Sequence, residues 1–371
     1  MTRRNPAMHL ATINPTAMNA MALNPLRRAL LLTGLGAAWN AQALPAKTLV
    51  FPRDHGSHPD FRTEWWYLTG HATSGERALG FQVTFFRSRV AATQDMKSKF
   101  AAKQLLFAHA AVTDVQGKKL LHDQRIMREG FDVAHASLVD TKVQIKDWSL
   151  QRNAKHYKAA IEGDGFQIAL QCTPTQTVLL QGEKGLSRKG PEEKQASYYY
   201  SQPQLEVQGT IRLGQTDLPV KGTAWLDHEW SQELLHPQAV GWDWIGMNLF
   251  DGSAVTAFQL RDKNGQPLWD GGSFRTKAGQ RFRFSKGEVI FSRQRSWKSP
   301  LSQASYPVEW IVRTPADFYT VKAVIPNQEL DSRASTGAIY WEGLSDLFDS
   351  NGKHVGRGYL EMTGYARPLK I

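Results

Sequence analysis

The sequence has 371 residues, which is long enough for two domains, and a formal net charge of +11 at pH 7. Its lysines and arginines are scattered among acidic and aromatic residues without a dense run, which argues against a nucleic-acid-binding protein. The single cysteine, Cys172, excludes an intrachain disulfide and a cysteine-based metal cluster.

The first segment is typical of a secretory signal. Arg27 and Arg28 precede a short apolar run, residues 29–38, and Ala41-Gln42-Ala43 supplies a small-x-small cleavage site. No later run reaches the roughly 20 apolar residues that span a bilayer, so we expect no transmembrane segment in the mature chain. The prediction is a signal peptide over residues 1–43 and a periplasmic or secreted protein. Met1 and Met21 both stay open as the start, as do Sec and Tat export.

Strands dominate the chain after residue 60. Residues 80–85, 143–146 and 165–170 alternate apolar and polar side chains, and Gly, Asn and Asp mark the turns between such segments. No stretch of the mature chain has a sustained 3.6-residue apolar stripe. The sequence therefore predicts an all-β protein.

An internal repeat organises these strands. The segment that starts at Trp65 and runs through Phe81 recurs without a gap from Trp242 through Phe258, with Gly75 matching Gly252. A weaker match pairs Trp225-Leu226-Asp227 with Tyr359-Leu360-Glu361, and Gln208-Gly209 with Glu342-Gly343. Since antiparallel sheets of this size must hide their edges, two barrels from a duplication are expected, over residues 44–232 and 233–371.

Two positions differ in chemistry between the copies. Asp243 stands where the first copy has Trp66, and His228 stands where the second copy has Met362. Strand alternation places Asp243 on a face with Ile245 and Met247, and His228 beside Leu226 and Trp230.

One hypothesis is that these two residues form an acid–base pair in an aromatic pocket, because burial can keep a carboxylic acid neutral. The alternative is structural: Asp243 forms a buried ion pair with an arginine such as Arg261, and His228 is a core histidine with its hydrogen bonds satisfied. The Trp65-Trp66-Tyr67 run and Glu64 face the same choice between core and ligand cavity.

Other motifs are weaker. Asp54-His55-x-x-His58-x-Asp60 has metal-ligand residue types but no evident third, distant ligand, so no metal is predicted. Ser231 lacks the Gly-x-Ser-x-Gly context of a serine hydrolase, and no glycine-rich phosphate loop is present. No cofactor is predicted.

Several motifs, taken in order, resemble those of the carotenoid 1,2-hydratase (CrtC) and AttH-type "predicted secreted hydrolase" family. They are Phe51-Pro52-Arg53-Asp54-His55, Thr63-Glu64-Trp65-Trp66-Tyr67, Asp227-His228-Glu229-Trp230-Ser231, Gly241-Trp242-Asp243-Trp244, Tyr340-Trp341-Glu342-Gly343 and Gly358-Tyr359-Leu360-Glu361-Met362-Thr363-Gly364-Tyr365. The resemblance spans nearly the whole mature chain and implies two tandem lipocalin-like antiparallel β-barrels. The AttH-type branch is the more similar one.

If hydratase chemistry carries over, the resemblance implies that Asp243 protonates an isolated C=C bond, Trp230 stabilises the cation and His228 directs water. The predicted catalytic residues are thus Asp243, His228 and Trp230, and the predicted ligand-binding residues are Trp65, Trp66, Tyr67, Glu64, Trp242, Trp244 and Glu229. The expected partner is a hydrophobic isoprenoid or acyl ligand. The alternative is a non-catalytic lipid carrier or chaperone associated with an ABC exporter.

Overall fold

The computed structural model describes residues 43–153, 155–233 and 235–369, which belong to one compact unit. Its regular structure is almost entirely β-strand, and the two 3-10 helices, Arg53–His55 (η1) and Ala91–Thr93 (η2), are single turns. The all-β prediction is confirmed. Apart from Ala43, the predicted signal peptide lies outside the described residues. Within the described ranges, no helix is long and apolar enough to cross a membrane.

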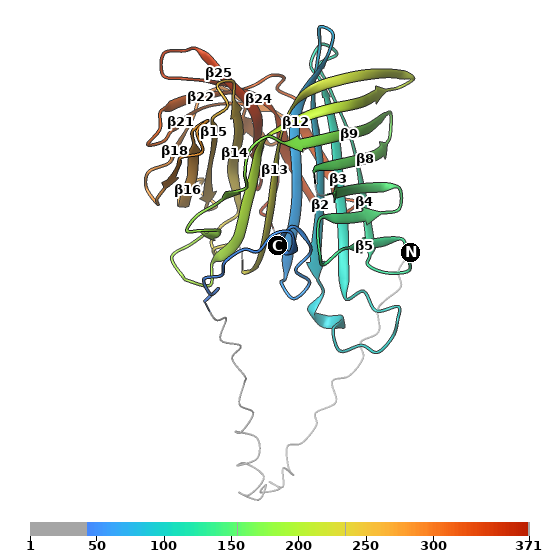
Figure 1. The fold of residues 1–371 in the computed structure, drawn as a ribbon. Coiled ribbons are helices and arrows are strands. Elements are labelled where there is room, and N and C mark those ends of the chain that lie inside the picture. The colour runs from blue at the N-terminus through green and yellow to red at the C-terminus, as the bar shows by residue number, and fades with distance from the viewer. Residues whose placement is uncertain (1–42, 154, 234, 370–371) are drawn as a thin grey trace, which may run out of the picture. The chain divides into compact units, whose positions relative to one another are not determined.

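The first large sheet contains thirteen antiparallel strands (Figure 1). Eleven of them follow the order β4-β3-β2-β1-β13-β12-β9-β8-β7-β6-β5, and β10 and β11 pair with β12. Strands β3, β4 and β6 approach each other, so the sheet curls toward closure. The strands are β1 Thr63–Ser74, β2 Arg77–Arg89, β3 Gln104–Asp114, β4 Lys119–Arg128, β5 Ala134–Ala136, β6 Lys142–Ile145, β7 Trp148–Asn153, β8 His156–Gly163, β9 Phe166–Pro174, β10 Leu179–Leu180, β11 Leu186–Arg188, β12 Ala196–Leu213 and β13 Thr216–Glu233.

The second large sheet contains ten strands in the order β17-β16-β15-β14-β25-β24-β22-β21-β18, with β23 paired to β24. A two-stranded sheet, β19-β20, accompanies it. The strands are β14 Gly241–Leu249, β15 Ala254–Arg261, β16 Pro267–Arg275, β17 Arg281–Phe284, β18 Ile290–Arg293, β19 Ser296–Lys298, β20 Ser305–Pro307, β21 Glu309–Arg313, β22 Phe318–Ala323, β23 Glu329–Ser332, β24 Ala338–Phe348 and β25 His354–Met362.

Both large sheets share one connection pattern, in which the first strand pairs with its successor and with the last strand. Thus β1 lies between β2 and β13, and β14 lies between β15 and β25. The register also agrees, because Tyr67 lies opposite Asp227 and Trp244 lies opposite Glu361, as both sequence matches require. The duplication and the lipocalin-like β-barrel class predicted from the sequence are confirmed.

Alternation sends each strand's side chains to two different places. Trp66 and Leu226 belong to the core inside the first sheet, and Ile245 and Leu360 to the core inside the second. The residues between them point the opposite way and form a third cluster, made of Tyr67, Trp225, Trp244, Ala254, Phe258, Leu344 and Tyr359. Burying each large apolar side chain stabilises the fold by about 1.5–3 kcal/mol.

The ungapped repeat hides a shift between the first and second strands of each half. Phe81 lies opposite Gly70, so the repeat predicts Met247 opposite Phe258, yet the residue there is Trp244. A shift of three residues is odd, and an odd shift turns a strand's side chains to the other face. Phe81 therefore lies in the first core, whereas Phe258 belongs to the third cluster. The reason is the length of the connection, since residues 75–76 separate the last paired residues of β1 and β2 but residues 249–253 separate those of β14 and β15.

Polar contacts connect the two large sheets. The Gln204 backbone N–H donates to Asn248 Oδ1 at 2.8 Å, and the Thr113 hydroxyl donates to Gln328 Oε1 at 2.8 Å. His109 Nδ1 is 2.8 Å from the Tyr340 hydroxyl. The facing surfaces are therefore held in a defined arrangement by directional bonds as well as by apolar contact.

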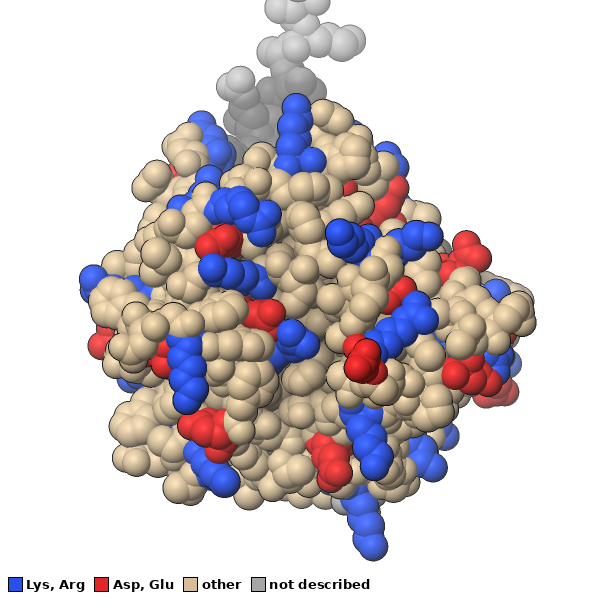
Figure 2. Space-filling view, turned by 90° about the horizontal axis from the view of Figure 1, so that it is seen from above, with Lys and Arg blue, Asp and Glu red and all other residues tan. Residues whose placement is uncertain are grey.

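Charged side chains on the face shown in Figure 2 alternate in sign, with Lys and Arg interspersed among Asp and Glu. This distribution matches the scattered basic residues of the sequence.

Candidate functional site

A cavity of about 390 Å³ lies between the two large sheets, and we call it the inter-sheet pocket. Strands β1, β2, β3, β12 and β13 contribute residues from the first sheet, and β14, β15, β24 and β25 from the second. Its aromatic lining includes Trp65, Tyr67, Trp242, Trp244 and Phe258. These residues lie there because alternation turns them away from both barrel interiors.

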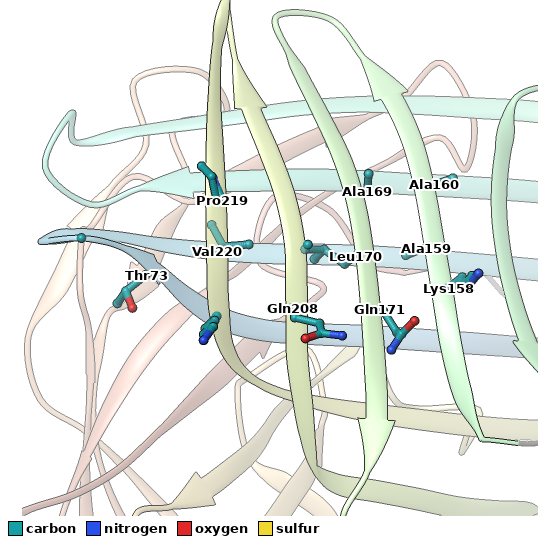
Figure 3. Close-up of a pocket in the computed structure, with 13 residues that line it drawn as sticks. Thr73, Lys158, Ala159, Ala160, Ala169, Leu170, Gln171, Gln208, Pro219 and Val220 are labelled. Carbon is teal, nitrogen blue, oxygen red and sulfur yellow. The ribbon is translucent and has the colours of Figure 1, made fainter.

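A larger hollow of about 830 Å³ crosses β8, β9, β12 and β13 near the end of β1, and we call it the outer hollow (Figure 3). Its lining is small or apolar, as at Ala159, Ala169 and Leu170, with Lys158 and Gln171 among the polar residues. Among its described lining residues there is no acid, histidine or aromatic ring. The chemistry is therefore concentrated in the smaller inter-sheet pocket.

Five carboxylates line the inter-sheet pocket, namely Glu64 on β1, Asp227 and Glu229 on β13, Glu342 on β24 and Glu361 on β25. The exposed fractions of Asp227, Glu229 and Glu342 are only 3%, 4% and 3%. Burying a charged carboxylate costs free energy unless a cation or hydrogen bonds compensate for it. The contacts of each one therefore decide its protonation.

Asp227 is surrounded by donors. Tyr199 and Ser201 donate through their hydroxyls, and the Trp225 indole N–H donates at 2.7 Å. Burial nevertheless raises the pKa of Asp227 to about 7, against the lowering effect of these bonds, and the charge of Glu229 raises it further. Because three donors favour the charged form, Asp227 is poorly placed to carry a proton toward a ligand.

Glu342 and Glu361 lie directly opposite each other on neighbouring strands. Burial raises the pKa of Glu342 well above its ordinary value, and the charge of Glu361 raises it further. Burial also raises the pKa of Glu361, whose only lowering contact is the Trp242 indole, while Asp227 and Glu229 raise it. Like charges opposite each other destabilise a sheet, so a charge on either carboxyl favours the protonated form of the other.

Lys189 supplies positive charge to another part of the pocket. Its Nζ atom lies 3.0 Å from Glu229 Oε1, which also accepts a hydrogen bond from the Ser197 hydroxyl. The same atom lies 4.2 Å from the ring centroid of Phe258 and 4.9 Å from that of Tyr199. Lys189 thus neutralises Glu229, whereas no ion pair to Glu342 or Glu361 occurs among the described residues.

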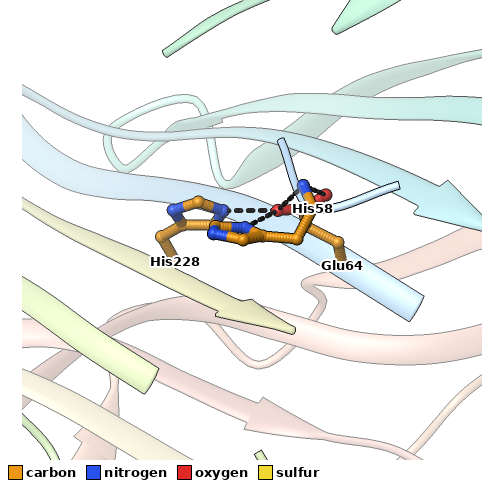
Figure 4. A group of neighbouring side chains, drawn as sticks. All are labelled: His58, Glu64 and His228. Atoms are coloured by element: carbon orange, nitrogen blue, oxygen red, sulfur yellow. Dashed lines mark hydrogen bonds and ion pairs between the residues drawn. The ribbon is translucent and has the colours of Figure 1, made fainter. Parts of the chain in front are cut away.

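Glu64, the fifth of these carboxylates, belongs to a second group of titratable side chains, which is shown in Figure 4. Glu64 Oε1 is 2.8 Å from His58 Nδ1 and 2.9 Å from His228 Nε2, and Arg87 Nε donates to Glu64 Oε2 at 2.8 Å. We call Glu64, His58, His228 and Arg87 the interior cluster. Although burial alone would raise the pKa of Glu64, the bonds from His228 and His58 hold it well below its ordinary value.

The interior cluster also has the residue types of a metal site. One atom each of His58, Glu64 and His228 lies within 4.8 Å of the others, so the structure supplies the distant ligands that the Asp54–Asp60 motif lacked. Glu64 also accepts hydrogen bonds from the Ser57 hydroxyl and the His58 backbone N–H, in addition to Arg87. A cation at Glu64 would have to compete with the Arg87 guanidinium, so we interpret the cluster as a structural anchor.

The structure separates the three predicted catalytic residues. Asp243 Oδ2 lies 2.7 Å from Arg261 Nε, and Asp243 also accepts bonds from Gln259 and the Tyr365 hydroxyl. This is the ion pair that the structural alternative named. His228 instead bonds to Glu64, and burial lowers the pKa of its imidazole to about 4.

The predicted pairing of Asp243 with His228 is therefore corrected. The two side chains share no bonding partner among the described residues, because β13 points His228 into the first barrel and β14 points Asp243 into the second. Trp230, which is fully buried, stacks on His58 with ring centroids 3.7 Å apart. It too lies inside the first barrel.

Six of the seven predicted ligand-binding residues line the inter-sheet pocket: Trp65, Tyr67, Glu64, Trp242, Trp244 and Glu229. Trp66 does not, because its indole lies inside the first barrel and donates to the His55 carbonyl at 3.1 Å.

Sequence reasoning missed Asp227, Glu342 and Glu361 as pocket residues. A signal for them existed, since the weaker match aligned Asp227 with Glu361 and Gln208 with Glu342. The site predicted from the sequence rests instead on the positions that differ between the copies.

Residues 42–365 match the model of the AttH-like family. A solved structure described as a candidate AttH from Nitrosomonas europaea is 46% identical, with a TM-score of 0.82 over 87% of this chain and 99% of that one. Kievitone hydratase from Nectria haematococca is 12% identical, with a TM-score of 0.67 over 88% of this chain and 98% of that one, a likeness of fold alone. No curated protein matches the sequence.

Proposed function

Because this chain belongs to the AttH-like family, we propose that it binds a hydrophobic isoprenoid or acyl ligand in the inter-sheet pocket and adds water to an isolated C=C bond by acid catalysis. The likeness of fold to a hydratase motivates the choice of reaction. The aromatic lining of the cavity supports the choice of ligand, since small-molecule sites are mostly apolar with a few placed polar groups.

One observation carries the proposal: Glu361 lines the aromatic pocket directly opposite Glu342, and neither carboxyl has a cation partner among the described residues. Protonating an alkene carbon requires a strong neutral acid in a site that excludes water. Burial and the neighbouring carboxylates Asp227 and Glu229 raise the pKa of Glu361 to about 7, so part of the population carries the acid form at neutral pH. Glu361 is therefore the proton donor of the proposed reaction, in place of Asp243.

The rings around Glu361 suit the cation that such a protonation creates. Trp244 lies opposite Glu361 on the neighbouring strand, and Trp242 and Trp65 line the same cavity. An aromatic face stabilises a cation by about 0.5–2 kcal/mol, more where water is excluded.

The direct test uses a medium-chain alkene that ends in an isopropylidene group. The full chain is incubated with it in D₂O, and the product is examined by mass spectrometry. We expect a tertiary alcohol that carries one deuterium on the carbon next to the carbinol. Recovery of the alkene bound to the protein but unchanged after long incubation would contradict catalysis and favour the lipid-carrier alternative.

We also propose export to the periplasm, which rests on the basic pair and apolar run of residues 27–43. Association with an ABC exporter belongs to the carrier alternative. Mass spectrometry of the protein from a periplasmic fraction tests export, with an N-terminus near Ala43 as the expected result.

A further inference from the structure

Two phenylalanines stack on each other in solvent at one end of the first barrel. Phe100, in the connection between β2 and β3, is 72% exposed, and Phe131, in the connection between β4 and β5, is 52% exposed. Their ring centroids are 5.4 Å apart, with an angle of 19° between the ring planes. The guanidinium carbon of Arg128 lies 4.1 Å from the ring centroid of Phe131 and 5.4 Å from that of Phe100.

This stacked pair is more than scattered surface apolarity. Met96, which is 51% exposed, lies in the same connection as Phe100. Single exposed apolar side chains are ordinary, whereas contiguous ones beside charged residues mark a surface that contacts a partner. We call Met96, Phe100, Phe131 and Arg128 the rim patch.

Phe131 has a backbone conformation that suits glycine. Its φ is 60° and that of Asp132 is 56°, so both residues lie in the left-handed region. A bulky side chain is rare there, because its Cβ crowds the carbonyl oxygen, and such strained residues collect at functional sites. Glycine would relieve the strain and expose less apolar surface, so the stability of the isolated protein does not account for this phenylalanine.

The connection that carries Phe100 is basic. Residues 90–103 contain the three exposed lysines Lys97, Lys99 and Lys103, and only one acid, Asp95. Each lysine close to an anionic lipid surface strengthens binding by about fivefold, and aromatic rings insert at the level of the headgroups. A basic connection that presents an apolar ring therefore has the charge and the apolar surface that an anionic bilayer attracts.

The rim patch lies at the end of the first sheet where the inter-sheet pocket is most exposed. From this end inward, the pocket-lining residues change from exposed at Arg62 to half-buried at Trp65 and buried at Tyr67. Strands β2 and β3 line the pocket through Phe86 and Phe107, which lie opposite each other, and the basic connection joins these two strands (Figure 1).

We infer that the rim patch docks the protein on an anionic lipid bilayer, with Phe100 and Phe131 among the headgroups and the lysines of residues 90–103 against the lipid phosphates. This inference goes beyond the proposed function, because it holds whether the ligand of the pocket is hydrated or only carried. Docking in this way brings the exposed end of the pocket close to the membrane, so a hydrophobic ligand crosses little water on its way between the two.

Sedimentation with vesicles tests the inference without any pocket ligand. One vesicle type is phosphatidylcholine alone, and the other contains an equal amount of phosphatidylglycerol. The protein tested lacks residues 1–42, because the apolar run of residues 29–38 would bind lipid by itself, and the remaining chain is one compact unit that contains every described strand. We expect wild type to bind the anionic vesicles at least about tenfold more tightly, and to lose most of that preference at about 1 M salt.

Two variants remove the rings of the rim patch. Phe100→Ser is expected to weaken binding to the anionic vesicles by about tenfold, because it takes a phenylalanine side chain out of the lipid contact. Phe131→Gly should weaken binding similarly, while its melting temperature stays at the wild-type value or rises because the strain is relieved. Phe318→Ser on β22 is the control, since Phe318 is 54% exposed in the other large sheet, and wild-type affinity is expected.

A double variant tests the charge. Lys97→Gln combined with Lys99→Gln should weaken binding to the anionic vesicles by about tenfold or more, and leave binding to phosphatidylcholine unchanged. Lys263→Gln combined with Lys298→Gln is the matched control, because both lysines are exposed and lie in the second half of the chain. Circular dichroism establishes that each variant is folded.

Three results would overturn the inference. They are failure of wild type to bind the anionic vesicles, equal binding to both vesicle types, and wild-type affinity in Phe100→Ser and Phe131→Gly. A dimer that Phe100→Ser dissociates, in a protein that binds no vesicle, would instead assign the rim patch to a second copy of the chain. The proposed function is tested separately by deuterium incorporation, so it stands or falls independently of these results.

Discussion

The interior cluster and the inter-sheet pocket both bury carboxylates, but they surround them with opposite partners. Glu64 in the interior cluster contacts Arg87, His58 and His228. In the pocket, Glu342 and Glu361 face each other without a cation partner among the described residues. Consequently the pKa of Glu64 is held well below its ordinary value, while burial raises the pKa of both pocket glutamates.

This difference distinguishes a carboxylate that stabilises the fold from one that is able to take part in catalysis. A carboxylate with a cation and several donors keeps one protonation state and fixes the elements that supply its partners. Here those elements are the loop that carries His58, together with β1, β2 and β13. A carboxyl without a cation changes its protonation readily, which is what a proton donor must do. The predictions below are ordered by expected effect.

Glu361→Gln is expected to show the largest effect, on activity. The amide keeps the shape of the side chain but has no proton to donate to carbon, and the loss of general acid catalysis costs about 10²–10⁴-fold in rate. Stability should stay unchanged or rise, because a costly buried carboxyl is removed. Rates of deuterium incorporation and melting temperatures measure the two effects. A variant that keeps the wild-type rate would remove Glu361 from the mechanism.

Glu64→Gln should instead reduce stability. It leaves Arg87, whose side chain is 0% exposed, without its carboxylate partner. Breaking a buried ion pair from one side costs about 3–5 kcal/mol in the free energy of unfolding. Urea denaturation measures the change, with Glu309→Gln as the control at a half-buried surface ion pair. Equal unfolding midpoints for these two variants would show that the interior cluster does not anchor the fold.

The stability of the protein should depend on pH in opposite directions because of the inter-sheet pocket and the interior cluster. Because the pKa of Asp227 is raised to about 7, the folded protein holds a proton that the unfolded chain loses near pH 4. Asp227 therefore contributes stability below about pH 4 that is lost as the pH rises toward 7, by up to about 1.4 kcal/mol per pH unit. Glu64, whose pKa is lowered, contributes stability that is lost as the pH falls below its ordinary range.

Asp227→Asn tests the predicted loss of stability between about pH 4 and pH 7. The variant should be less sensitive to pH between about 4 and 7 than wild type, whereas its loss of stability in acid should be unchanged. Unfolding midpoints across that range supply the measurement. An identical slope in both proteins would mean that Asp227 titrates normally in the folded state.

Alternation in the sequence correctly placed Asp243 with Ile245, and His228 with Leu226, on inward faces. It could not show that the outward faces of β13 and β25 lie against each other, since that contact joins residues more than a hundred positions apart. The ungapped match also could not show that a longer connection between β14 and β15 turns Phe258 to the face opposite to that of Phe81. The positions that differ between the copies predict the chemistry at Asp243 and His228, yet the matched pair Asp227 and Glu361 lines the cavity. The copies differ inside the barrels, where each core has its own packing and its own ion pair.

Asp243→Asn sharpens the comparison because Asp243 differs between the copies and yet lies outside the pocket. Its partner Arg261 also donates to the backbone carbonyls of Thr363 and Trp242, so the guanidinium keeps part of its hydrogen bonding when the carboxylate is lost. We expect a loss of about 2 kcal/mol in stability, less than for Glu64→Gln. The rate of hydration at a temperature where the variant is folded should match wild type within about twofold, because Asp243 contributes no atom to the inter-sheet pocket. A rate as low as that of Glu361→Gln, in a variant with unchanged stability, would show that Asp243 is the proton donor, as the sequence first suggested. It would also assign Arg261 a role in catalysis.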